Sequence, residues 1–301
     1  MKINFICRKG AAFPWSMGQG MENALKELGH EVNTFIAEKD SVRQIPLYDK
    51  FFEFIKSPCD LILVMGGGDK YYPFYTDCSV REYVKNMKVP TVTYLMESMK
   101  TRTITRMRYE KSVSIWSHVW TVDETEIEDL KNVGGKNVKY APGWIDENIF
   151  KPKNVPIKYD TQFIGWLHDH RLPYMEYFRK GLGTVNNKYE TVEDYVRGIN
   201  ETKILIAFPS VFTGFTQRVT ETLACGKLLL HPTLSEGFKK SKELFKDREN
   251  IVFYKTMEEG VALAKYYLEH EEERKQIELN ARKEILNKHT IKARVKEFIM
   301  V

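Results

Sequence analysis

Apolar residues in this chain gather in short runs of strand length, and segments with helical spacing separate several of them. In the first half the runs lie at 2–7, 32–37, 59–68, 89–98, 117–123 and 137–143. They are apolar almost throughout, without the alternation of a strand that has one solvated face. Such strands, alternating with helices, are typical of a parallel sheet that is covered on both faces. The pattern therefore predicts an α/β fold.

The same pattern starts again in the second half. Strands are expected at 161–167, 203–208, 227–232 and 249–254, with helices at 192–200, at 216–225 and from Met257 onward. Between the halves, residues 143–158 carry few apolar runs, as a linker does. We expect two doubly wound, Rossmann-like α/β domains that face a cleft. Their predicted bounds are 1–143 and 159–286, with a linker at 144–158 and a last helix at 287–301 that could cross back to the first domain.

Composition and charge limit the kinds of ligand, metal site and cellular location that we expect for this protein. The 301 residues carry a net charge of +5, which permits an anionic ligand or partner without requiring one. The four cysteines lack zinc-site spacing, which fits a reducing cytoplasm. No apolar run reaches the length of a membrane span, and the amino terminus reads as a buried strand and not as a signal peptide. We expect a cytoplasmic protein with no transmembrane segment.

The segment 215–230, FTQRVTETLACGKLLL, carries the first candidate chemistry. At helical spacing, Arg218, Glu221 and Thr222 share one face, while Val219 and Leu223 occupy a face that can dock on a sheet. Arg218 can clamp a phosphate, and Glu221 can accept two ribose hydroxyls. The alternative is an ordinary ion pair between Arg218 and Glu221 on a solvated surface.

The residues just before this helix predict an anion site as well. The helix is expected to start near Phe215 or Thr216, after Gly214. Backbone amides at a helix N-terminus lack an intrahelical acceptor, and the helix dipole favours negative charge there. We expect the amides of Gly214, Phe215 and Thr216 to face a phosphate.

Three places in the first half are candidates for the other side of a cleft. Gly18 and Gly20 precede the first expected helix, where a G-x-G pair fits a ligand loop or an ordinary tight turn. The glycines at 66–68 and Asp69 follow a buried strand and form either a close backbone approach to a ligand or a plain turn. Glu97 ends another strand, where it could serve as a general base or orient a sugar.

Five basic residues follow Glu97, against one acidic residue, Glu110. The five are Lys100, Arg102, Arg106, Arg108 and Lys111. A charge run of this kind is usually a solvated helix face. The other interpretation is an anionic acceptor, DNA included, bound through counterion release.

The second domain opens with FIGWLHDHR, in which Gly165 ends a strand. His168, Asp169, His170 and Arg171 follow it. Three consecutive side chains rarely converge on one ion, and no further ligand is spaced to help, so we do not expect a metal there. An exposed polar turn is the plain interpretation of this loop.

Taken together, these segments resemble the GT-B glycosyltransferases. GFTQRVTETLACGKLLL and the tract 249–290 resemble the carboxyl-terminal half of the glycosyltransferase family 4 type (glycosyl transferases group 1), with the CgeB-like group as the nearest branch. APGWIDENIFKP resembles the family's interdomain segment P-G-V-D-x-x-x-F-x-P. The resemblance covers most of the chain, and its motifs lie mainly in the second half.

The resemblance implies roles for individual residues. In that family a Glu in the helix E-A-x-A-C-G binds the donor ribose, and Glu221 in ETLACG matches it. The family's loop after the first strand of the second domain lies over the donor phosphates, which implies Gly165, His168 and Arg171. Many members carry another Glu eight positions earlier that touches the donor sugar, where this chain has Thr213. That departure leaves the sugar contacts and the stereochemistry open.

We therefore expect a metal-independent glycosyltransferase, transferring a hexose or a pentose from a nucleotide-diphosphate sugar. A UDP-sugar is the expected donor, and a glycan, protein or lipid is the acceptor. The candidate donor-binding residues are Glu221, Arg218, Thr222, Gly214, Phe215, Thr216, Gly165, His168, Arg171 and Gly18, and the candidate catalytic residue is Glu97. Two alternatives stay open: a DNA-modifying glycosyltransferase that acts on a modified base, and a nucleotide-sugar-binding protein without turnover.

Overall fold

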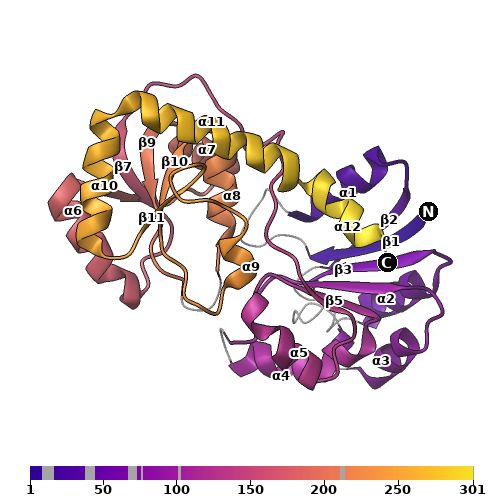
Figure 1. Ribbon diagram of the computed structural model, residues 1–301. Helices are drawn as coiled ribbons and strands as arrows, with labels where there is room; N and C mark the ends of the chain where they lie inside the picture. Colours follow the sequence, from indigo (N-terminus) through magenta and orange to yellow (C-terminus); the bar gives the residue numbers. More distant parts are fainter. Residues whose placement is uncertain are drawn as a thin grey trace. The chain divides into compact units, whose positions relative to one another are not determined.

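The computed structural model of the protein describes residues 1–8, 17–37, 45–66, 73–75, 77–100, 103–210 and 214–300. These residues form two compact units, each with its own sheet and core (Figure 1). The first unit comprises the described residues up to Pro142 and those from Ile291 onward. The second unit comprises the described residues from Gly143 to Thr290.

The first unit is built on a parallel sheet that has six strands within the described residues, in the order β2-β1-β3-β4-β5-β6. They are β1 (Lys2–Arg8), β2 (Glu31–Ala37), β3 (Leu61–Met65), β4 (Thr91–Leu95), β5 (His118–Thr121) and β6 (Val138–Tyr140). Each of them falls within a predicted apolar run or differs from it by one residue at an end. The strand order reverses between β1 and β3, as it does in doubly wound folds.

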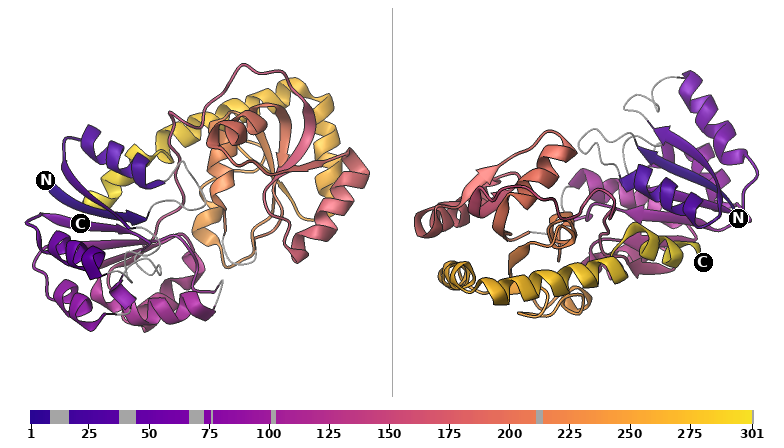
Figure 2. Two further views of the ribbon diagram at one scale, coloured as in Figure 1. Left: turned by 180° about the vertical axis from the view of Figure 1, so that it is seen from behind. Right: turned by 90° about the horizontal axis from the view of Figure 1, so that it is seen from above.

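Helices cover both faces of this sheet. They are α1 (Met17–Glu27), α2 (Ile45–Lys56), α3 (Cys78–Lys85), α4 (Thr103–Ser112), α5 (Ile127–Asn132) and α12 (Ile291–Ile299). The views of Figures 1 and 2 show α12, from the end of the chain, beside α1, and an ion pair joins Lys292 to Glu27. The last helix therefore belongs to the first unit.

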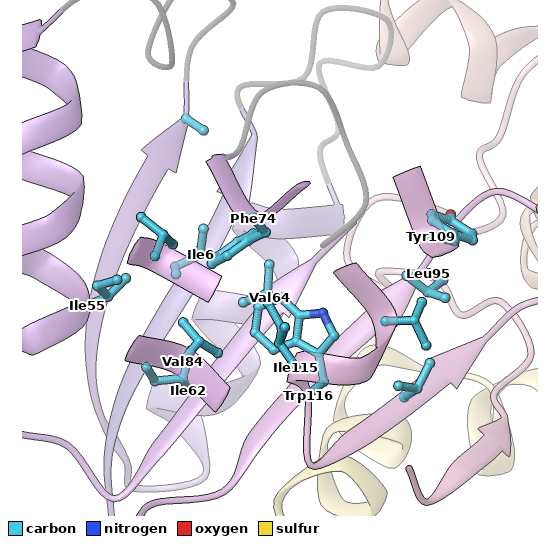
Figure 3. Close-up of a cluster of buried hydrophobic side chains, with 14 of the residues drawn as sticks. Ile6, Ile55, Ile62, Val64, Phe74, Val84, Leu95, Tyr109, Ile115 and Trp116 are labelled. Atoms are coloured by element: carbon cyan, nitrogen blue, oxygen red, sulfur yellow. The ribbon is translucent and has the colours of Figure 1, made fainter. Parts of the chain in front are cut away.

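The core of the first unit explains why its strands read as continuous apolar runs. Ile6, Ile62 and Val64 point to the face covered by α2 and α3, where they pack in one cluster with Ile55 and Val84 (Figure 3). The positions next to them in the strands are also buried but lie outside that cluster, among them Ile3, Phe5, Leu61 and Leu63. Both faces of each central strand are thus covered, which is why both faces are largely apolar.

The second unit has a parallel sheet of five strands within the described residues, in the order β11-β10-β9-β7-β8. They are β7 (Tyr159–Ile164), β8 (Val185–Asn187), β9 (Thr202–Ile206), β10 (Leu228–Pro232) and β11 (Val252–Tyr254). The chain leaves β7 for β8 on one side and returns to β9 on the other. The strand order therefore reverses between β7 and β9.

Helices flank this second sheet as well, with α6 and α10 to one side and α7 and α8 to the other (Figure 1). Their bounds are α6 (Leu172–Leu182), α7 (Val192–Asn200), α8 (Gln217–Ala224), α9 (Lys239–Lys242), α10 (Met257–Glu269) and α11 (Glu271–Lys288). Local sequence sets several ends. The Thr191 hydroxyl accepts a hydrogen bond from the Asp194 amide and begins α7, and Gly183, with a φ of 68°, ends α6.

Three elements differ from the sequence-based expectation. Helix α1 begins at Met17, so Gly18 and Gly20 lie in its first turn and not in a loop before it. The helical tract from Met257 is two helices, which end and begin at His270. β8 has no counterpart among the expected strands. None of the described helices is long and apolar enough to cross a membrane.

Candidate functional site

The reversal point between β7 and β9 is where the candidate residues of the second unit gather. In open α/β sheets, ligands bind beyond the carboxyl ends of the strands, at the place where the strand order reverses. Gly165 directly follows β7, and residues 207–210 lead away from β9 toward α8. The two loops that sequence analysis assigns to donor binding therefore start at this one point of the sheet.

Arg171 ties these two loops together. It closes the short 3-10 turn Asp169–Arg171 before α6 and is 9% exposed. Its Nη1 donates to the Trp166 carbonyl at 3.1 Å, and its Nε donates to the Pro209 carbonyl at 3.4 Å. Both acceptors are neutral, and Arg171 forms no ion pair within the described chain. The guanidinium therefore keeps its positive charge at the reversal point.

Arg218, from the first turn of α8, brings a second positive charge to the same place. The guanidinium carbons of Arg218 and Arg171 lie 5.3 Å and 5.8 Å from the centre of the Phe163 ring, within the range of cation–π attraction. Burial, and secondly the charge of Arg218, lower the pKa of Arg171. Two like charges that act on each other in this way favour a bound anion, which would relieve both desolvation and repulsion.

The Arg218 side chain has no hydrogen-bond or ion-pair partner among the described residues. Within the part of the chain that the structure describes, it makes neither a hydrogen bond nor an ion pair, and its Nε is buried without an acceptor. An ion pair with Glu221 on a solvated surface, the alternative interpretation, is therefore not what the structure has. The contacts that do hold the guanidinium are the Phe163 ring and the backbone of Gly165.

Gly165 is the residue that lets Arg218 lie so close to the strand end. Its φ of 143° is a conformation that other residues rarely adopt. A Cβ atom at this position would lie 2.4 Å from Nη2 of Arg218 and 3.0 Å from its Cζ. A side chain here would therefore strain the backbone and displace the guanidinium together.

We expect Gly165→Ala to lower donor affinity by about tenfold or more, because Arg218 must move away from the strand end, and to cost about 1–3 kcal/mol of stability through the strained φ. Calorimetric titration with a nucleotide and thermal unfolding measure the two effects. Gly183→Ala is the matched control, since it has a positive φ of 68° but open space around the missing Cβ. That control should lose stability alone, and equal losses of affinity in both variants would contradict the assignment.

The amino end of α8 presents backbone amides next to the two arginines. Thr216 is the N-cap residue, and its carbonyl accepts from the Val219 amide at 3.0 Å. The amides of 214–218 have no acceptor among the described residues. These donors, together with the helix dipole, favour an anion at this end of α8.

Side-chain packing holds the segment that precedes α8 in the chain. The Phe215 ring lies in an aromatic cluster, with ring centres 5.0 Å from His231 and 5.3 Å from Phe245. Gly214 packs against Ser241, whose Oγ would be 2.5 Å from an added Cβ. The contribution of Gly214, Phe215 and Thr216 to a ligand would therefore come from their backbone, as predicted, and the Phe215 ring only fixes the loop.

Glu221 lies one turn further along α8 and is 5% exposed. The Tyr195 hydroxyl, from α7, donates to its Oε2 at 2.5 Å. Sequence analysis missed this partner because the spacing of Tyr195 in VEDYVRGIN shows only that it belongs to a buried helix face. Thr222 is fully buried, with its hydroxyl oxygen unpartnered among the described residues, and its role in donor binding stays a prediction.

The two histidines of HDH lie on the surface. The rings of His168 and His170 are stacked with their centres 6.0 Å apart, and the His168 carbonyl accepts from the Arg171 amide at 2.7 Å. No group of three His, Cys, Asp or Glu side chains suited to a metal occurs in the described residues. In the structure, this turn orients Arg171.

The candidate catalytic residue lies in the first unit. Glu97 follows β4 with an exposed side chain, and its carbonyl accepts from the Tyr109 hydroxyl at 2.7 Å. The loop after it is anchored by Glu126, a residue that sequence analysis did not single out. Glu126 is fully buried, its Oε2 accepts from the Met99 amide at 2.6 Å, and burial raises its pKa to about 7.

The remaining candidates of the first half are separated or only partly described. Gly18 is buried in the first turn of α1. Lys100 lies 3.7 Å from Asp129, and Arg106 lies 2.9 Å from Glu110, so neighbouring carboxylates offset two charges of the basic run. Asp69, Arg102 and Thr213 lie outside the described residues.

Residues 159–300 match a protein family described as glycosyl transferase-like. A sequence comparison with curated proteins finds no match.

Several solved structures share the fold of the whole chain at low sequence identity. HepE from Anabaena, determined in complex with UDP-glucose, superposes with a TM-score of 0.65 at 12% identity, covering 100% of this chain and 99% of its own. Sucrose-phosphate synthase from Thermosynechococcus elongatus gives 0.65 at 11%, covering 99% and 97%. An alpha-glucosyltransferase in complex with UDP-glucose and DNA gives 0.67 at 11%, covering 100% and 98%.

These structures have the GT-B arrangement of two parallel-sheet α/β domains, which is the architecture that the apolar pattern predicts. The placement in the CgeB-like branch stays a prediction. Residues 159–300 form a glycosyl transferase-like domain, and the chain has the GT-B fold.

Proposed function

We propose that the second unit binds a UDP-sugar at the reversal point of its sheet and that the protein transfers the sugar to an acceptor. The observation that carries this is the pair Arg171 and Arg218, two guanidinium groups without a carboxylate partner in the described chain, beside the amino end of α8. The diphosphate of the donor supplies the missing negative charge. HepE and the alpha-glucosyltransferase, which share the fold, were determined with UDP-glucose, and this supports uridine as the base.

In this proposal two parts of α8 bind different groups of the donor. Its first turn and Arg218 receive the diphosphate, because the free amides and the guanidinium both donate to phosphate oxygens. Glu221 receives the ribose hydroxyls, because a carboxylate is an acceptor for two donors at once. Arg218 and Glu221 lie about one helical turn apart on α8, so they can reach adjacent groups of one nucleoside diphosphate.

The site must stabilise the negative charge of the leaving group. When the bond to the sugar breaks, negative charge grows on the departing diphosphate. Fixed positive groups that point at this charge stabilise the transition state more than the ground state. Arg171, Arg218 and the α8 amides would provide this stabilisation, so we expect turnover to continue in the presence of a chelator.

The acceptor side belongs to the first unit in this proposal, with Glu97 as the group nearest the chemistry. Its exposed carboxylate after β4 could take a proton from an acceptor hydroxyl or orient the sugar. Glycan, protein and lipid acceptors all offer such a hydroxyl. DNA with a modified base is the second candidate, because the alpha-glucosyltransferase that shares this fold was determined with DNA. Salt-sensitive retention on duplex DNA, lost when Lys111 and Arg106 are neutralised, would favour it.

The direct test is a thermal-shift panel of UDP-, GDP-, ADP- and dTDP-glucose on the purified protein. A ligand that binds only the folded state raises the unfolding temperature, by about 5 °C at a concentration about 100-fold above its Kd. We expect UDP-glucose or another UDP-sugar to give the largest shift. Release of UDP from that donor, followed with EDTA present, then separates an enzyme from a binding protein without turnover. If no nucleotide sugar shifts the transition, the proposed donor site is wrong.

A further inference from the structure

The contact between Tyr195 and Glu221 is the shortest side-chain pair described at the donor site. The hydroxyl of Tyr195 and Oε2 of Glu221 are 2.5 Å apart, and the two residues are 7% and 5% exposed. A short hydrogen bond from a neutral donor to a buried carboxylate is among the stronger polar contacts in proteins. It is also the kind of contact that decides how a carboxylate is oriented.

The position of Tyr195 is itself fixed by the surrounding chain. Its ring centre lies 6.1 Å from that of Phe150 in an edge-to-face arrangement and 6.5 Å from that of Tyr189. Phe150 is the aromatic residue of APGWIDENIFKP, and it is 3% exposed. Further along the same segment, the Lys153 amide donates to Oδ1 of Asn200 at the end of α7. The segment that enters the second unit therefore braces the helix that carries Tyr195.

Tyr195 is the hydrogen-bond donor of the pair. Burial, and secondly the charge of Glu221, raise the pKa of Tyr195 well above its usual value, so the hydroxyl keeps its proton and always donates. A hydrogen bond donated to the ionised form of a carboxyl group stabilises that form.

We propose that Tyr195 is a positioning residue for ribose recognition, holding the Glu221 carboxylate in the one orientation in which it accepts the donor's ribose hydroxyls. The role rests on the proposed function of Glu221 and extends it to α7 and to the segment around Phe150. Phe150 packs on Tyr195, and Tyr195 sets Glu221. The interdomain segment would thus contribute to donor affinity without touching the donor.

The experiment is Tyr195→Phe, which removes the hydroxyl and keeps the ring. The Kd values of UDP and of 2′-deoxy-UDP are measured by calorimetry for wild type, Tyr195→Phe and Glu221→Gln. We expect wild type to prefer UDP, and Tyr195→Phe to bind UDP about tenfold more weakly with a smaller loss for 2′-deoxy-UDP, which keeps only the 3′-hydroxyl. The ratio of the two constants is the readout, because general loosening of the site would weaken both nucleotides alike.

Tyr189→Phe is the matched control. Tyr189 lies in the same aromatic group, but its hydroxyl accepts a hydrogen bond from Nε2 of Gln162 at 3.2 Å and is not the group that donates to Glu221. It should leave the preference for UDP unchanged.

The outcomes separate the two claims. If Glu221→Gln loses the preference and Tyr195→Phe keeps it, the positioning role is overturned while the ribose site stands. If Tyr195→Phe weakens both nucleotides equally, the tyrosine is only structural and the proposal is also overturned. If wild type binds UDP and 2′-deoxy-UDP equally, or Glu221→Gln changes nothing, the ribose site itself is wrong.

Discussion

Replacing Arg218 by alanine should lower kcat/KM for donor turnover by about 100-fold to 1000-fold and leave the protein at least as stable as wild type. The loss is large because Arg218 would act on charge that develops as the diphosphate leaves, and removing one donor of this kind from a transition-state site typically costs that much. Stability should not fall, because the guanidinium makes no hydrogen bond or ion pair within the described chain and lies in the field of Arg171. Release of UDP from the donor and thermal unfolding measure the two quantities.

A surface arginine of the same unit provides the control for this variant. Arg179 lies on α6 with an exposed side chain, and its replacement by alanine changes the net charge by the same amount. We expect Arg179→Ala to keep wild-type activity. If Arg218→Ala instead unfolds at a clearly lower temperature and keeps its activity, then Arg218 is structural and the diphosphate lies elsewhere.

Glu221→Ala should weaken donor binding by about 30-fold to 100-fold, the second largest effect that we expect. The variant loses the acceptor for two ribose hydroxyls, and hydrogen bonds to a charged group contribute more than neutral ones. It also leaves the buried Tyr195 hydroxyl without this acceptor, at a cost of about 1–3 kcal/mol of stability. Calorimetric titration with UDP and thermal unfolding should show both losses together.

Glu221→Gln separates affinity from stability. The amide oxygen can still accept from Tyr195, so stability should stay near that of wild type, while the affinity for UDP still falls by about tenfold because the charge is gone. Glu193→Gln, an exposed residue of α7, is the control and should change neither quantity. Wild-type affinity in Glu221→Gln and Glu221→Ala would remove Glu221 from the donor site.

The apolar pattern predicted most of the sheet in each unit, because central parallel strands are buried on both faces and read as continuous runs. The apolar pattern did not predict β8, for the opposite reason. It consists of Val185, Asn186 and Asn187, which is short and contains two residues that rarely favour strands. Its pairing with β7 comes from tertiary context that the local sequence does not contain.

The helix boundaries that differ also have local causes. Gly18 and Gly20 lower helix propensity, so the sequence favoured a loop, but both glycines are buried in the first turn of α1. No glycine or proline lies next to His270 that would predict the break between α10 and α11. Packing of α10 and α11 decides that boundary, and packing is not readable from residue spacing alone.

For the proposed donor site, the sequence and the family resemblance pointed to some residues that gather, but not to how they are held. Gly165, Arg171 and Arg218 were each assigned to donor phosphates, and the structure brings them together at the end of β7. Helical periodicity could place Glu221 and Tyr195 on buried faces. It could not show that one donates to the other, because that contact joins two helices whose distance only the folded sheet determines.

The most direct measurement is a crystal structure of the protein with UDP bound. The account predicts phosphate oxygens within hydrogen-bonding distance of Arg218 and of the amides at the amino end of α8, with Arg171 nearby and both ribose hydroxyls on Glu221. UDP bound at any other place, or with its ribose and diphosphate exchanged between Glu221 and Arg218, would contradict it.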